Sequence, residues 1–132
     1  MYKISIQNSD IVPEEFIDLS KSVGWGANKN WNLDEVQNAL NKTALVVTIR
    51  NEKGKLIGCG RVLSDGLLFT TIPDIFVRPE YQRQGIGTMI MEVIKEHFRH
   101  TPIFFGSQSG NETFFEKLGF EKGIQSYQGK FK

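Results

Sequence analysis

The sequence predicts an α/β domain with a mixed, mostly antiparallel central sheet flanked by helices. Three β-rich runs follow one another between residues 44 and 77, which is typical of a β-meander. Segments with helical apolar spacing precede and follow these runs. The chain has 132 residues, of which 39% are hydrophobic and 23% charged. This size and composition predict a single domain spanning residues 1–132.

The N-terminal third predicts one strand and two helices. Residues 2–7 alternate between apolar and polar side chains, as a half-buried strand does. Pro13 suits the first turn of a helix that runs to about Val23. After a polar and aromatic loop, Asn32 followed by Glu35 predicts the N-cap and capping box of a short second helix.

The meander comprises predicted strands at residues 44–51, 56–63 and 67–77. Asp65-Gly66 between the second and third runs is a hairpin signal, because glycine tolerates positive φ. Pro73 interrupts the third run. Since proline donates no hydrogen bond to a sheet ladder, it predicts a β-bulge or a local loss of pairing.

The C-terminal half changes to a helical pattern. Apolar residues at helical spacing predict a helix over residues 86–98, followed by a short strand at 103–105. Residues 112–118 predict a short helix that Gly119 ends. In the tail from Phe120, Tyr127 and Phe131 stand among polar residues, so a last strand or strand pair is expected there.

Charge and composition exclude several classes of function. Lys and Arg total 16 against 15 for Asp and Glu, which gives no global field for nucleic acid or for an anionic membrane. One cysteine and two histidines nearly exclude a structural zinc site. No apolar run approaches the roughly 20 residues of a membrane helix, and the N-terminal residues lack the apolar core of a signal peptide. A cytoplasmic location is therefore expected.

The turn at residues 82–88 is the segment most suggestive of ligand binding. Gly85 and Gly87 stand where a strand gives way to a helix, and the free N–H groups of a new helix attract anions. The turn reads either as a pyrophosphate cradle or as a strand-to-helix connection that simply needs glycine. It matches neither a P-loop, because Gly87 is followed by Thr88-Met89, nor a dinucleotide fingerprint, because Ile90 replaces the third glycine.

Two motifs carry a resemblance to a known family. The run VRPEYQRQGIG at residues 77–87 resembles the acetyl-CoA signature of the GNAT N-acetyltransferase superfamily, whose core is Gln/Arg-x-x-Gly-x-Gly/Ala. The run FFEKLGF at residues 114–120 resembles that family's second signature, Phe-Tyr-Glu-Lys-Leu-Gly-Phe. Both occur in the family's order, and the predicted order of strands and helices matches over nearly the whole chain.

The resemblance implies an N-acetyltransferase that moves acetyl from acetyl-CoA to a primary amine by direct attack in a ternary complex. It implies acetyl-CoA as the co-substrate, with no metal. The acceptor is a small-molecule amine or a protein amine, neither nucleic acid nor a membrane is expected as a partner, and a homodimer is left open. The alternative is an acyl-CoA-binding sensor or regulatory module without efficient turnover.

The resemblance also assigns roles to residues. The backbone of the central strand should bind the pantetheine amides, and the N–H of Val77 should polarise the thioester carbonyl. The glycine-containing turn should wrap the pyrophosphate, with residues of the second motif beside it. The residues expected to bind the coenzyme are Ile75, Phe76, Val77, Gln82, Arg83, Gln84, Gly85, Ile86, Gly87, Thr88, Gln108, Asn111, Phe114 and Phe115.

Catalytic groups are where this sequence departs from the family. The tyrosine that usually acts as the general acid is Phe115, which has no proton to donate. Gln108 and Asn111 occupy places where the family often has asparagine and a small residue. Asp74 is a candidate base acting through water, or else a structural aspartate at the bulge. Tyr127 is a candidate acid only because it is a phenol near the second motif.

Three further groups have two interpretations each. Trp25 and Trp31 either wall an acceptor pocket or pack the helices onto the sheet. Cys59 is expected to be a small buried side chain rather than an acetyl carrier. His97 and His100 are expected to complement a helix C-terminus rather than to ligate a metal.

Overall fold

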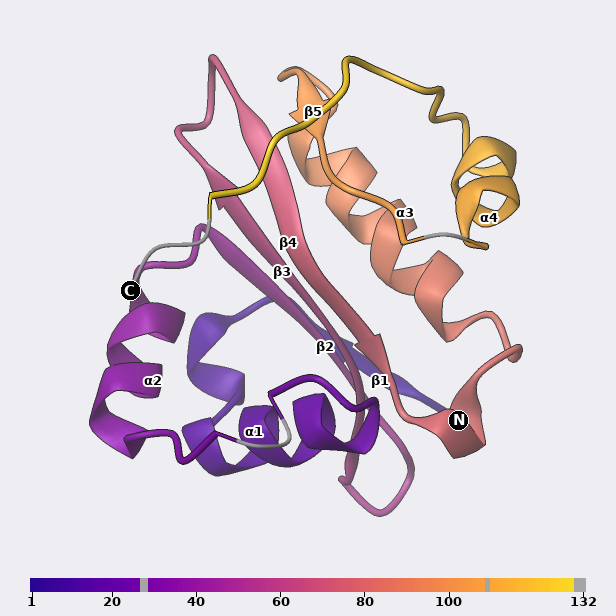
Figure 1. Cartoon of the computed structure of the whole chain (residues 1–132). Helices are drawn as coiled ribbons and strands as arrows, with labels where there is room; N and C mark the ends of the chain where they lie inside the picture. The colour runs from indigo at the N-terminus through magenta and orange to yellow at the C-terminus, as the bar shows by residue number, and fades with distance from the viewer. Residues whose placement is uncertain (27–28, 109, 130–132) are drawn as a thin grey trace.

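The structure, a computed structural model, describes residues 1–26, 29–108 and 110–129. Its five strands form one sheet in chain order, in which β4 and β5 run parallel and the other neighbours antiparallel (Figure 1). The elements are β1 (Lys3–Ser5), the 3₁₀ turn η1 (Asn8–Asp10), α1 (Pro13–Ser22), α2 (Leu33–Asn41), β2 (Leu45–Arg50), β3 (Leu56–Ser64), β4 (Thr70–Val77), the 3₁₀ turn η2 (Pro79–Tyr81), α3 (Ile86–Phe98), β5 (Ile103–Phe104) and α4 (Glu112–Lys117). The predicted fold class is confirmed.

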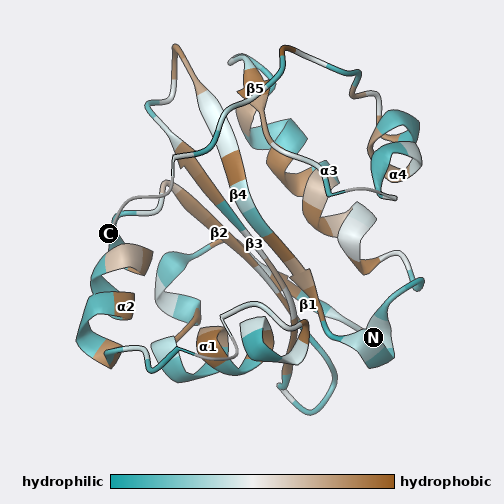
Figure 2. Ribbon diagram, in the orientation of Figure 1, coloured by the Kyte–Doolittle hydropathy of each residue, from teal (hydrophilic) through white to brown (hydrophobic). Residues whose placement is uncertain are grey.

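Helices cover both faces of the sheet. The helix α3 lies on one face, whereas α1 and α2 lie on the other, and their apolar sides face the strands (Figure 2). Alternate residues of one strand enter different cores because side chains alternate across a strand. In β2, Val47 packs in the core under α3 and Val46 packs in the core under α1 and α2.

Two glycines of β3 let α3 approach the sheet closely. A Cβ atom at Gly58 would lie 2.9 Å from Cγ2 of Ile86, and one at Gly60 would lie 2.4 Å from Cγ2 of Ile90. Any side chain at these positions would push α3 outward. Because α3 begins at Ile86, these glycines also fix where its N-terminus stands relative to β4.

A β-bulge interrupts β4 at Pro73, as the sequence predicts. Arg61 of β3 lies opposite Asp74, but Leu63 lies opposite Thr71, so two residues of β4 face one of β3. The extra residue reverses the alternation of side chains. Ile72 therefore packs in the core under α3, whereas Phe76, four residues later, packs in the core under α1 and α2.

One strand prediction was wrong in extent, and one predicted strand is absent from the described residues. β4 begins at Thr70 rather than at residue 67, because Oδ1 of Asp65 accepts hydrogen bonds from the N–H groups of residues 67–69 and holds them in a loop. The predicted last strand is absent from residues 120–129, where Ile124 and Tyr127 are exposed and bury no common face. Residues 130–132 lie outside the described part.

Other local predictions are confirmed. The side chain of Asn32 caps α2 by accepting a hydrogen bond from the N–H of Glu35 at 3.1 Å. Gly119, with φ of 92°, follows the end of α4. Over the described ranges, none of the helices is long and apolar enough to cross a membrane.

Candidate active site

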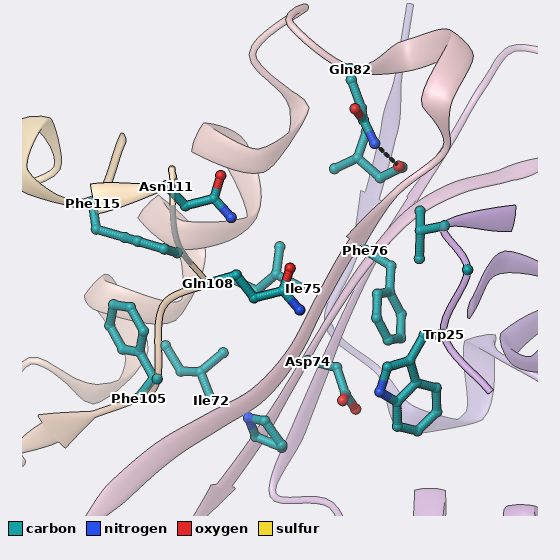
Figure 3. Close-up of a pocket in the computed structure, with 15 residues that line it drawn as sticks. Trp25, Ile72, Asp74, Ile75, Phe76, Gln82, Phe105, Gln108, Asn111 and Phe115 are labelled. Atoms are coloured by element: carbon teal, nitrogen blue, oxygen red, sulfur yellow. Dashed lines mark hydrogen bonds between the residues drawn. The ribbon is translucent and has the colours of Figure 1, made fainter. Parts of the chain in front are cut away.

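A cleft of ≈ 450 Å³ opens where β4 and β5 separate. β5 pairs with β4 only through Thr70 opposite Ile103 and Thr71 opposite Phe104, so the described residues leave the rest of that edge of β4 without a neighbouring strand. One wall comes from β4 and the residues after α1, and the other from the segment between β5 and α4 (Figure 3). The cleft is lined by Val23, Gly24, Trp25, Ile72, Pro73, Asp74, Ile75, Phe76, Val77, Gln82, Phe105, Gly106, Gln108, Asn111 and Phe115.

The backbone of β4 presents polar groups to this cleft. The N–H of Arg78 donates to the carbonyl of Ile57 at 2.9 Å, which points it toward β3. N–H groups alternate between the two edges of a strand, so those of Ile75 and Val77 point to the opposite edge, into the cleft. The bulge at Pro73 sets this alternation. A ligand in the cleft therefore meets two main-chain donors.

Gln82 closes one end of the open edge. Its Nε2 donates to the carbonyl of Val77 at 2.9 Å, the contact drawn dashed in Figure 3. This hydrogen bond satisfies the carbonyl and leaves the N–H of the same residue available. The side chain of Gln82 thus fixes the turn that leads to α3, a more specific role than the expected contact with pyrophosphate.

The turn before α3 has the backbone geometry of an anion site. Arg83 has φ of 65° and Gly85 has φ of 83°, and such left-handed residues direct neighbouring N–H groups toward one side. The first N–H groups of α3 have no acceptor within the helix. A Cβ at Gly87 would lie 3.3 Å from the ring of Phe114, so this ring covers the first turn of α3.

The structure brings together most of the residues predicted to bind the coenzyme. Those on β4, Gln82, Gln108, Asn111 and Phe115 line the cleft, and the turn of residues 83–88 continues from Gln82. Ile86 is buried in the core under α3, so only its N–H group can face a ligand.

Asp74 lies in the cleft and is paired with a residue that the sequence did not indicate. The carboxylate accepts a hydrogen bond from Nε of Arg61 at 2.5 Å, and only 6% of the residue is exposed. Arg61 is directly opposite Asp74 in the antiparallel register. Asp74 is the one titratable side chain among the described residues that line the cleft.

Tyr127 does not reach the cleft. The residue is 92% exposed on the C-terminal tail and is absent from the cleft lining, so the structure gives no support to its predicted role as an acid. Phe115 does line the cleft, with its ring centroid 4.7 Å from that of Phe105. The described lining therefore holds an apolar ring where the family usually has a phenol.

A second pocket of ≈ 320 Å³ lies between α1 and α2, on the other side of Trp25. Trp25 stacks on Trp31 with ring centroids 5.8 Å apart, and Trp25 also contacts the ring of Phe76. The tryptophans therefore pack beside the helices and also wall this pocket, and its use by an acceptor stays a prediction.

Cys59 is packed in the core, and each of the two histidines contacts a backbone carbonyl. Cys59 is completely buried, and burial raises the pKa of its thiol to about 12. His97 contacts the carbonyl of Val93, and His100 contacts the carbonyl of Gly66. Within the described ranges, no group of three His, Cys, Asp or Glu side chains could hold a metal ion.

Comparison with known families settles the identity of the domain. The profile of the acetyltransferase (GNAT) domain matches residues 41–122, which include β4, the turn and α4. The chain belongs to the GNAT acetyltransferase family. The resemblance seen in the two sequence motifs is thereby confirmed.

Relatives and solved structures agree with this family. An uncharacterized N-acetyltransferase named ycf52 from Gracilaria tenuistipitata var. liui is 30% identical over 132 residues, covering 94% of this chain and 70% of that protein. The namesake from Pyropia yezoensis is 28% identical over 130 residues, covering 94% and 73%. The fold matches a GNAT-family acetyltransferase from Streptococcus pneumoniae with a TM-score of 0.79 at 23% identity, covering 98% of this chain and all of the other.

Proposed function

We propose that this GNAT domain transfers an acetyl group from acetyl-CoA to a primary amine by direct attack within a ternary complex. The observation that carries the proposal is the open edge of β4, whose N–H groups at Ile75 and Val77 face the cleft. A peptide-like pantetheine arm can add to such an edge as an extra strand would. The thioester would then lie beside the N–H of Val77.

Different parts of the chain would bind different parts of acetyl-CoA and the amine. The turn of residues 83–88 and the first N–H groups of α3 hold the pyrophosphate, because main-chain donors at a helix N-terminus favour anions. Ile75 and Val77 hold the pantetheine and the thioester carbonyl. Asp74 receives the substrate ammonium at the base of the cleft. Gln108 and Asn111 supply amide groups from the facing wall.

The reaction needs only acetyl-CoA, the amine and water. The substrate ammonium first loses a proton to water. Its nitrogen then forms a bond to the acetyl carbonyl carbon, and the carbon–sulfur bond breaks. The nitrogen gives up its second proton to water as it becomes the amide, and the coenzyme leaves as a thiolate that takes up a proton. The N–H of Val77 stabilises the negative charge on the carbonyl oxygen during attack. No phenol stands at Phe115, so this proton comes from solvent.

Binding at the turn is tested by matched substitutions. Gly85 has φ of 83°, which aspartate and asparagine tolerate about equally. Gly85→Asp places a carboxylate against the expected pyrophosphate, whereas Gly85→Asn has the same size without charge. We expect calorimetry to show a much larger loss of acetyl-CoA affinity for Gly85→Asp. Equal affinity of both folded variants and the parent would contradict the assignment.

Turnover is tested by release of free thiol from acetyl-CoA with a panel of primary amines, including polyamines, lysine peptides, arylalkylamines and amino acids. The second candidate function is an acyl-CoA sensor, favoured by the absence of a phenol at Phe115. Tight coenzyme binding without thiol release across the panel would support the sensor. The cytoplasm remains the expected compartment, and the oligomeric state is left open.

A further inference from the structure

The two members of one ion pair line different pockets. Asp74 lines the cleft and Arg61 lines the second pocket, while Trp25 lines both. The Nε of Arg61 donates to Oδ2 of Asp74 at 2.5 Å. Both side chains lie on the sheet face that α1 and α2 cover. Cys59, two residues before Arg61, and Phe76, two residues after Asp74, pack in that core, and residues two apart in a strand share a face. The ion pair thus belongs both to the lining of the cleft, where the coenzyme is proposed to bind, and to the lining of the second pocket.

Each member of this pair keeps hydrogen-bonding capacity for a ligand. A guanidinium has five N–H donors, and that of Arg61 makes hydrogen bonds within the described ranges through Nε alone. Its side chain is 18% exposed. Likewise, Oδ1 of Asp74 has no donor among the described residues. The second pocket is therefore lined by the N–H donors of Arg61, and the cleft is lined by the acceptor Oδ1 of its ion-pair partner Asp74.

The second pocket is otherwise mostly apolar. Its walls come from Phe16, Val36 and Leu40 of the two helices together with the stacked tryptophans. Glu35 belongs to the same lining and is exposed, so it places a negative charge at the mouth. A half-buried cation in a mostly apolar pocket suits a ligand that carries one anionic group on an apolar body.

We infer that the acceptor is a free α-amino acid with an apolar side chain, an inference that rests on the proposed acetyl transfer. An α-amino acid has its ammonium and carboxylate separated by a single carbon, and the pair of Asp74 and Arg61 presents the complementary charges in adjacent positions. The ammonium binds Asp74 beside the thioester, and the carboxylate binds the terminal nitrogens of Arg61. The side chain enters the second pocket against Trp25.

This arrangement distinguishes amino acids from other amines. A polyamine or an arylalkylamine leaves the donors of Arg61 in the pocket without an anion. A protein N-terminus offers an amide in place of the carboxylate. An acidic side chain would approach Glu35 and be repelled, so aspartate and glutamate should be poor substrates.

The test compares three substrates on the unmodified protein, which removes any question of folding. These are L-phenylalanine, L-phenylalanine amide and phenethylamine, which share the ring and the primary amine. We expect kcat/KM for L-phenylalanine to exceed that for the other two by about 10- to 100-fold, the usual worth of a charge-assisted hydrogen bond. Glu35→Gln should improve turnover of aspartate relative to that of L-phenylalanine.

A binding measurement separates the inference from the proposed function. Fluorescence of the stacked tryptophans, excited where phenylalanine does not absorb, is titrated with each compound in the presence of coenzyme A. Preferential binding of L-phenylalanine without thiol release would uphold the pocket ligand and overturn acetyl transfer. Turnover of phenethylamine or the amide equal to that of L-phenylalanine would overturn the inference and leave the acetyltransferase standing. No preference in either assay overturns the inference.

Discussion

Substitution of Gly60 by alanine tests how closely α3 must approach the sheet. The added Cβ would lie 2.4 Å from Cγ2 of Ile90 and 3.3 Å from Cδ1 of Ile94. Both isoleucines are completely buried, and Gly60 lies within a strand of the sheet, so neither side can yield into solvent. The contact must be relieved by movement of α3 or by strain.

The expected cost follows from this overlap. Inserting one methyl group into a well-packed core typically costs 1–3 kcal/mol of unfolding free energy. For a domain of this length that corresponds to a melting temperature lower by about 3 to 15 °C. Movement of α3 also displaces the turn of residues 83–88, so acetyl-CoA affinity should fall in the same variant.

Thermal and denaturant unfolding measure the effect, with Gly123→Ala as the matched control. A Cβ at Gly123 meets nothing within 4 Å, so this control should change stability by less than about 0.5 kcal/mol. In an Ile90→Ala background the clashing methyl group is gone, and Gly60→Ala should then cost at least about 1 kcal/mol less. An unchanged melting temperature for Gly60→Ala, or equal costs in both backgrounds, would refute the reasoning.

Three further predictions concern the chemistry. Phe115→Tyr should raise kcat, by up to about 100-fold, if the phenol reaches the leaving sulfur. Steady-state turnover measures this change. An equal or lower rate with coenzyme affinity retained means that the ring does not face the sulfur. Cys59→Ala should keep most activity, because a buried thiol with a pKa near 12 supplies almost no thiolate at neutral pH; an acetyl adduct on Cys59 in intact-mass spectra would reverse this conclusion. Val77→Pro removes the N–H that points into the cleft without breaking the ladder to β3, so single-turnover rates should fall about 10²- to 10³-fold while the protein still folds. A parent-like rate would show that this N–H does not contact the thioester oxygen.

The elements that the sequence predicted well are those specified locally. The cap at Asn32, the stop at Gly119 and the apolar face of α3 each depend on residues within a few positions of one another. The bulge at Pro73 was also predictable, because proline's missing N–H acts at its own position. The turn of residues 82–88 was recognised through its two glycines.

What the sequence could not show depends on pairing between distant residues. Arg61 meets Asp74 only through the register of β3 and β4, and that register includes the bulge. Gly58 and Gly60 lie in the interior of a strand, and only the packing of α3 shows why side chains are excluded there. The loop at residues 65–69 was misread because Asp65 accepts hydrogen bonds from three N–H groups that a hairpin strand would have used.

The bulge at Pro73 makes β4 unusually sensitive to a change in length. Deleting one residue there would shorten the strand only slightly. It would move the side chains of the following strand residues to the opposite faces of the sheet. Asp74 would then be carried into the apolar layer under α3, and Ile75 would face Trp25 instead. Surface loops of this domain can gain or lose residues during evolution at little cost. At this one position the number of residues determines which side chains face the cleft.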